Sequence, residues 1–85
     1  MKVIHTPSIT LRAGAIDTIK VRADGNRYYL LALLGNGHDL YIAEYMSLDA
    51  AEAERKNISI FLADGIGRYQ THSDSYWKTR LESEK

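Results

Sequence analysis

Cysteine is absent from this chain of 85 residues. A disulfide scaffold, a thiolate zinc site, an iron–sulfur cluster and a cysteine nucleophile are therefore excluded. The chain also lacks an excess of charge of either sign, because 11 Lys and Arg residues balance 11 Asp and Glu residues. A neutral chain does not indicate a protein that binds nucleic acid or a membrane surface through its overall charge.

Long hydrophobic runs are lacking as well. The longest uninterrupted apolar run covers residues 28–34, whereas a membrane-spanning helix needs about 20 apolar residues. The N-terminus has Lys2 followed by two aliphatic residues, which is far less than a secretory signal requires. Hydrophobic residues make up 45% of the chain and charged residues 26%, as in globular domains. We therefore expect a cytoplasmic protein that does not contact a membrane.

Hydrophobic periodicity predicts an antiparallel meander of four to five strands in the first half of the chain. Polar and apolar residues alternate over residues 8–12 and 16–23, and residues 27–34 and 39–45 are rich in aliphatic and aromatic side chains. Glycine and asparagine around Gly25 and Gly37 tolerate the positive φ of tight hairpin turns. These turns connect the second, third and fourth predicted strands.

A helix is predicted to follow the meander. Ser47 is a favourable N-cap, and Gly65 is a favourable residue to end the helix. At helical spacing, one apolar face is expected to contain Leu48, Ala51, Ile58, Phe61 and Leu62. Glu52 and Lys56 are expected to form an exposed i,i+4 ion pair. The predicted fold class is α+β, a small antiparallel meander followed by one packed amphipathic helix.

The pattern weakens after Gly67. Residues 70–75 are polar, and residues 76–81 have the spacing of one or two helical turns. We therefore divide the chain into one α+β domain, residues 1–67, and a C-terminal tail, residues 68–85, that is mobile or forms a short docking helix. Removing this tail is expected to leave the domain folded and to weaken assembly.

The strand over residues 27–34 is apolar on both faces, although one helix covers only one face of a small sheet. The second face needs a cover, either from the N-terminal strand, from the tail or from a second copy of the chain. We favour a homodimer, because a domain of this size without disulfides gains buried area by oligomerisation. The candidate interface residues are Tyr29, Leu31, Leu33, Tyr41, Tyr45, Tyr76, Trp77 and Leu81.

A small basic patch suggests an alternative function. Lys20, Arg22 and Arg27 lie on or beside the first predicted hairpin, close to Tyr28 and Tyr29. Exposed tyrosines on a sheet stack with single-stranded bases, so a nucleic-acid-binding module is the second hypothesis. The neutral charge of the chain argues against it, because such modules usually have an excess of lysine and arginine.

Residues that would indicate catalysis or a cofactor are scattered. His5, His38 and His72 lie far apart in the sequence and are expected to be solvated loop histidines. The glycines near residues 36 and 66 lack the following helix N-terminus that phosphate-binding loops have. We therefore predict no cofactor, no metal site and no enzymatic activity. A ligand site at a dimer seam near His38 and Tyr41 is the third and least favoured hypothesis.

The stretch from residue 16 to residue 62 resembles the C-terminal half of small bacterial pleckstrin-homology-like domains. The matching segments are Ile19-Lys20-Val21, Tyr29-Leu30-Leu31, residues 40–45, the helix start Ser47-Leu48-Asp49-Ala50-Ala51-Glu52, and Ile60-Phe61-Leu62. The resemblance implies a partial barrel that a second copy completes, and a binding role in place of catalysis. The full family domain has more strands than this chain can hold, and no basic lipid-binding loop is present to transfer.

Together these observations favour a non-enzymatic module that self-associates and binds a protein partner or serves as an accessory subunit.

Overall fold

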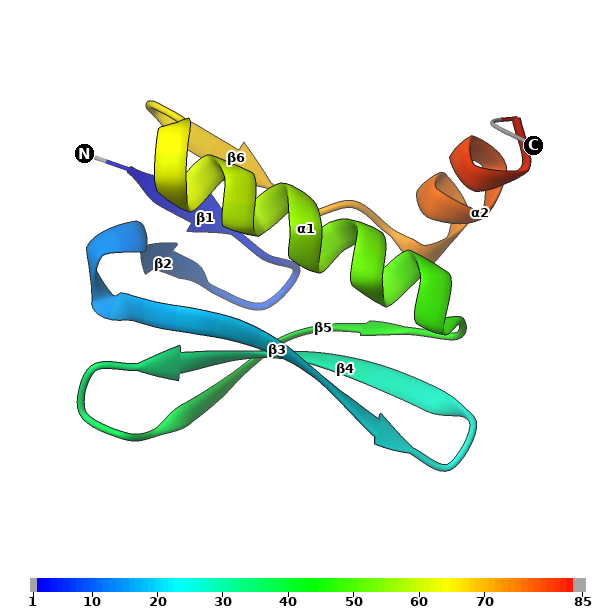
Figure 1. Ribbon diagram of the computed structural model, residues 1–85, viewed down its shortest axis with the longest axis horizontal. Coiled ribbons are helices and arrows are strands. Elements are labelled where there is room, and N and C mark those ends of the chain that lie inside the picture. Colours follow the sequence, from blue (N-terminus) through cyan, green and yellow to red (C-terminus); the bar gives the residue numbers. More distant parts are fainter. Residues whose placement is uncertain (1, 84–85) are drawn as a thin grey trace.

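The computed structural model describes residues 2–83, in which the strands form two three-stranded sheets and α1 packs against both (Figure 1). The predicted α+β class is confirmed. In chain order the elements are β1 (Val3–His5), β2 (Thr10–Arg12), a 3₁₀-helix (Ala13–Ala15), β3 (Ile16–Asp24), β4 (Arg27–Leu34), β5 (Asp39–Tyr45), α1 (Leu48–Asp64), β6 (Arg68–Gln70) and α2 (Asp74–Ser83).

The β3–β4–β5 sheet is the predicted antiparallel meander, with three strands instead of four or five. Strands β4 and β5 begin and end at the residues expected from the sequence. The turn between β3 and β4 contains Gly25 at φ 65°, a left-handed conformation that glycine adopts without a steric penalty. Local patterning and turn chemistry thus specify this sheet.

A β-bulge at Ile42 interrupts the pairing of β4 with β5. The extra residue lets both Ile42 and Ala43 point to the core, where they are 0% and 5% exposed. Beyond the bulge the alternation of faces is shifted, so Tyr45 also points inward and is 1% exposed. The placement of Tyr45 with Tyr41 among the candidate interface residues was therefore wrong, because the strict period of two ends at the bulge.

Both predicted ends of α1 are confirmed. The Ser47 side chain accepts a hydrogen bond of 3.1 Å from the Ala50 backbone N–H. At the other end the backbone N–H of Gly65 donates to the carbonyl oxygen of Phe61 at 2.8 Å. The Ser47 bond satisfies a backbone N–H that the start of a helix leaves without an intrahelical partner, and the Gly65 bond is the last i→i−4 bond of the helix.

The buried face of α1 differs in detail from the predicted one. Leu48, expected in the core, is 47% exposed. Glu52 pairs with Arg55 at 2.9 Å, three residues away, in place of the predicted pair with Lys56, four residues away. The buried residues of α1 are Ala50, Ala51, Glu54, Ile58 and Phe61.

The second sheet, β2–β1–β6, was not predicted, because the strand expected over residues 8–12 is present as β2 but pairs with β1 and not with the meander. β1 pairs antiparallel with β2 and parallel with β6, which comes from the segment after Gly67. Gly67 has φ 79°, which lets the chain turn from the end of α1 into β6. The expected tail therefore contributes a strand to the domain, and the boundary at Gly67 does not separate two parts. Residues 84–85 of that tail lie outside the described residues.

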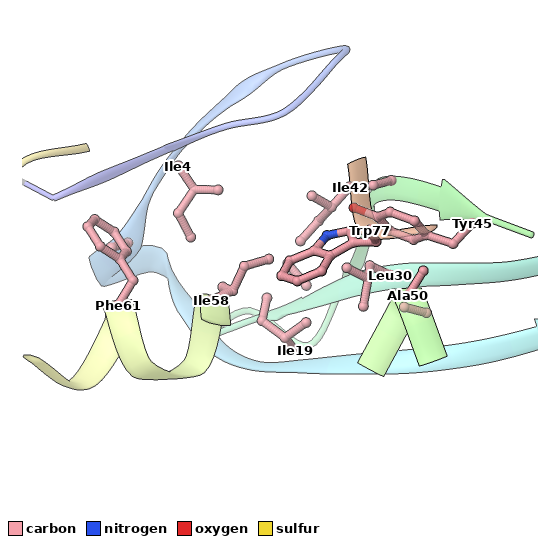
Figure 2. Close-up of a cluster of buried hydrophobic side chains, with 13 residues drawn as sticks. Ile4, Ile19, Leu30, Ile42, Tyr45, Ala50, Ile58, Phe61 and Trp77 are labelled. Atoms are coloured by element: carbon pink, nitrogen blue, oxygen red, sulfur yellow. The ribbon is translucent and has the colours of Figure 1, made fainter. Parts of the chain in front are cut away.

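One hydrophobic cluster joins both sheets and both helices (Figure 2). Ile4 from β1, Ile58 from α1 and Leu30 from β4 are each 0% exposed, and Trp77 from α2 is 3% exposed. The short helix α2 is thus anchored by a tryptophan that belongs to the central core. Among residues 2–83, no helix is both long and apolar enough to cross a membrane.

Candidate functional site

The candidate site is the face of the β3–β4–β5 sheet that points away from α1, which we call the outer face. Tyr29, Leu31 and Leu33 of β4 and Tyr41 of β5 lie on it, because they alternate with the core residues of their strands. The elements α1, α2 and β1 all send side chains into the cluster on the opposite, inner face. In the described part of the chain, the outer face is therefore left without a covering helix or strand.

The apolar residues of the outer face form a continuous strip. The rings of Tyr29 and Tyr41 are tilted against each other, with their centroids 5.8 Å apart. Leu31, between Lys20 and Tyr41 in the register, is 8% exposed, whereas Tyr41 is 44% exposed. Burial, followed by the charge of Glu44, raises the pKa of the Tyr41 hydroxyl, so Tyr41 stays neutral and suits an apolar contact.

Charged side chains of opposite sign flank this strip. Lys20 and Arg22 are on β3, and Asp39 and Glu44 are on β5. Lys20 Nζ reaches across β4 to Asp39 Oδ2 at 3.0 Å. Arg27, at the start of β4, forms an ion pair with Glu44. The predicted basic patch does lie at one sheet, but carboxylates neutralise two of its three cations.

Four of the predicted interface residues lie elsewhere. Tyr45 and Trp77 are in the core, and Leu81 is partly buried against it. Tyr76 is 37% exposed and stacks on the His72 imidazole, with centroids 4.1 Å apart. The outer face therefore unites Tyr29, Leu31, Leu33 and Tyr41 and excludes the other four.

A buried carboxylate cluster, which the sequence analysis missed, lies on the inner side of the fold. Glu54 of α1 is 0% exposed, and its carboxylate accepts hydrogen bonds from the Tyr69 hydroxyl and the His72 backbone N–H. The Tyr45 hydroxyl lies 3.2 Å from Glu54 Oε1 and 2.8 Å from the His72 carbonyl oxygen. His72 Nδ1 is 3.5 Å from Glu54 Oε1, so this histidine is not the solvated loop residue we expected.

The Glu54 cluster joins α1, β5, β6 and the segment before α2. Its carboxylate is inaccessible to a dissolved substrate, and it satisfies polar groups that would otherwise be buried without partners. Among the described residues, no group of three or more His, Cys, Asp or Glu side chains is placed to hold a metal ion. We interpret the cluster as a hydrogen-bond network that holds the C-terminal segment against α1 and β5.

Two tyrosines of this cluster should make stability fall at alkaline pH. Burial and the neighbouring Glu54 raise the pKa of both Tyr45 and Tyr69. Above a pH of about 10 the two tyrosine hydroxyls lose their protons in the unfolded chain but keep them in the folded chain. The free energy of unfolding therefore decreases as the pH rises. We expect a loss of up to about 1.4 kcal/mol per pH unit for each tyrosine.

Urea unfolding at several pH values checks this expectation, and Tyr45→Phe provides the comparison. The phenylalanine variant should show a shallower alkaline decrease, since one titrating group is removed. An equally steep decrease in both proteins would show that Tyr45 does not contribute to the pH dependence.

Comparisons with known proteins found no match to a family model, to a curated protein or to a solved structure. The strand–strand–strand–helix order that carries the resemblance to pleckstrin-homology-like domains is present as β3, β4, β5 and α1. Membership of that family stays a prediction.

Proposed function

We propose that this protein is a non-enzymatic module that forms a homodimer through the outer face of its β3–β4–β5 sheet. The observation that carries the proposal is a central strand with apolar side chains on both faces, while every packing element lies on one. Tyr41 is 44% exposed, Tyr29 and Leu33 are half-buried, and apolar strips that reach the surface in this way are characteristic of interaction surfaces. The dimer would then bind a protein partner or serve as an accessory subunit.

The charges beside the strip suit a second copy of the same chain. A twofold axis parallel to the strands would stack β3 of one copy over β5 of the other. Arg22, which has no ion pair among the described residues, would then face Glu44 of the second copy, and the Lys20–Asp39 pairs of the two copies would lie opposite each other. A twofold axis across the strands would instead bring like charges together, so the charge pattern favours one geometry.

The alternative functions are less favoured on this face. Nucleic acid would find Lys20 and Arg27 already paired with carboxylates, which leaves Arg22 as the basic residue of the patch without a partner among the described residues. His38, the residue suggested for a ligand site, is exposed in the turn before β5, and its backbone N–H bonds the Asn36 side chain at 3.0 Å. The paired charges and apolar strip support protein contact.

Replacing Tyr41 by lysine tests the proposal. Tyr41 is already 44% exposed, so the change should leave the single chain folded. Buried tyrosines at interfaces are often hot spots, and we expect Tyr41→Lys to weaken dimerisation by at least about thirtyfold. Ile66→Lys is the matched control, because Ile66 is 89% exposed in the connection between α1 and β6.

Sedimentation equilibrium gives the dimer dissociation constant of each variant, and circular dichroism checks that each is folded. If the two variants dimerise equally well, the interface does not include Tyr41 and the proposed face is wrong.

A further inference from the structure

The outer surface of the other sheet, β2–β1–β6, carries cationic and polar side chains in two rows. The register places Arg12 and Arg68 on either side of Val3, and Thr10 and Gln70 on either side of His5. Residues paired in this way point to the same face of a sheet. Ile4, between the two rows, points to the core and is 0% exposed. The two arginines are therefore exposed neighbours across one strand.

This sheet is built from two segments that contain no carboxylate. Residues 2–16 contain Lys2, His5 and Arg12, and residues 65–73 contain Arg68 and His72, but neither segment contains Asp or Glu. The nearest carboxylates in the sequence, Asp17, Asp64 and Asp74, lie outside the three strands. The zero net charge of the chain thus conceals an uneven distribution, because Arg12 and Arg68 are exposed on this sheet while its three strands contain no carboxylate.

Neither arginine forms an ion pair within the described part of the chain. The ion pairs found among residues 2–83 involve Lys20, Arg27, Arg55 and His72, and not Arg12 or Arg68. A hollow beside Arg12 is lined by Lys2, Gly14 and Ala15, and the Lys2 ammonium donates a hydrogen bond to the Leu62 carbonyl oxygen of α1 at 2.9 Å, so Arg12 and Arg68 are the cations of this face. His5 Nδ1 and the Thr10 hydroxyl are 2.8 Å apart, which holds the polar row in place.

We propose that this basic face binds the phosphate backbone of nucleic acid. Two strand spacings separate the arginine backbones by about 10 Å, and each guanidinium can pair with a phosphate through two hydrogen bonds. Arg12, Thr10, Arg68 and Gln70 are all exposed, which suits an extended polyanion better than a small ligand that needs enclosure. Its rows contain no Phe, Tyr or Trp, so contact would be to phosphates and independent of base sequence.

Fluorescence anisotropy with a labelled oligothymidylate of about 16 nucleotides tests the proposal across a salt series. We expect Arg12→Gln and Arg68→Gln each to weaken binding by about fivefold to tenfold and to reduce the salt slope by about one. Lys78→Gln, which removes one exposed cation from α2, should leave both quantities unchanged. The same measurement with a labelled DNA duplex tells whether the face binds single-stranded or double-stranded nucleic acid. Either probe supports the proposal if the two arginine variants, and not the Lys78 variant, bind it more weakly.

Several results would overturn the inference. Undetectable binding of both probes at low salt would do so, as would equal losses in the Lys78 and arginine variants. Loss of binding only in Arg22→Gln would move the contact to the β3–β4–β5 sheet. Competition by polyglutamate as effective per charge as by oligothymidylate would show a surface that binds anions without preference for phosphate.

Discussion

Removing residues 68–85 should unfold the protein. The truncation deletes β6, so β1 loses one of its two partners, and it deletes Trp77, which is 3% exposed in the core. Loss of a buried tryptophan side chain alone costs about 3–5 kcal/mol, and small domains are stabilised by only about 5–15 kcal/mol in total. The described part of this segment is therefore an integral part of the fold.

Circular dichroism and amide hydrogen exchange on the truncated chain check this expectation. Lys78→Ala, on the exposed side of α2, is the control for a change in the same segment, and it should remain folded. A truncated chain that keeps its helix signal and protected sheet amides, and loses only assembly, would contradict the account and restore the view of residues 68–85 as a docking tail.

Glu54→Leu should destabilise the protein by about 3–5 kcal/mol. The substitution removes the acceptor for the Tyr69 hydroxyl and for the His72 backbone N–H, and both groups stay partly buried without it. Glu54→Gln keeps one carbonyl oxygen as an acceptor but places an amide donor against other donors. An intermediate loss of about 1–3 kcal/mol is expected for it.

Glu52→Gln on the same helix is the matched control. Its side chain is 45% exposed in an ion pair with Arg55, and such pairs contribute about 0–1 kcal/mol. Urea denaturation of the three variants provides the comparison. If Glu54→Leu proves as stable as the wild type to within about 1 kcal/mol, hydrophobic packing replaces the cluster and Glu54 does not brace the C-terminal segment.

The elements that could be predicted from sequence are those specified by local signals. The hairpin turns, the strands β4 and β5, and the capping residues Ser47 and Gly65 each depend on a few neighbouring residues. The β2–β1–β6 sheet depends instead on pairing between residues 3–5 and 68–70, nearly the whole chain apart. β1 and β6 have three residues each, too few to show a reliable alternation, whereas β2 lies in a predicted strand whose pairing partner could not be read from the sequence.

The part of the candidate site on β4 could be predicted from the sequence, whereas the part on β5 could not. Alternation along β4 correctly placed Tyr29, Leu31 and Leu33 on one face, but a bulge is not marked in the sequence of β5 and reversed the placement of Tyr45. The buried position of Glu54 could have been predicted from its spacing in the sequence. It lies four residues after Ala50 and four before Ile58, so a carboxylate in the middle of an apolar helix face could have indicated a buried polar cluster.

The central claim, that the outer face pairs with a second copy, is tested most directly by the absolute mass of the wild-type chain in solution. Light scattering during size exclusion, over a concentration range of about two orders of magnitude, reports the fraction of dimer by mass action. We predict a mass that rises from 9.6 kDa towards twice that value, or that stays at twice that value throughout. A mass of 9.6 kDa at every concentration would contradict the account, because Tyr29, Leu33 and Tyr41 would then remain uncovered by a second copy.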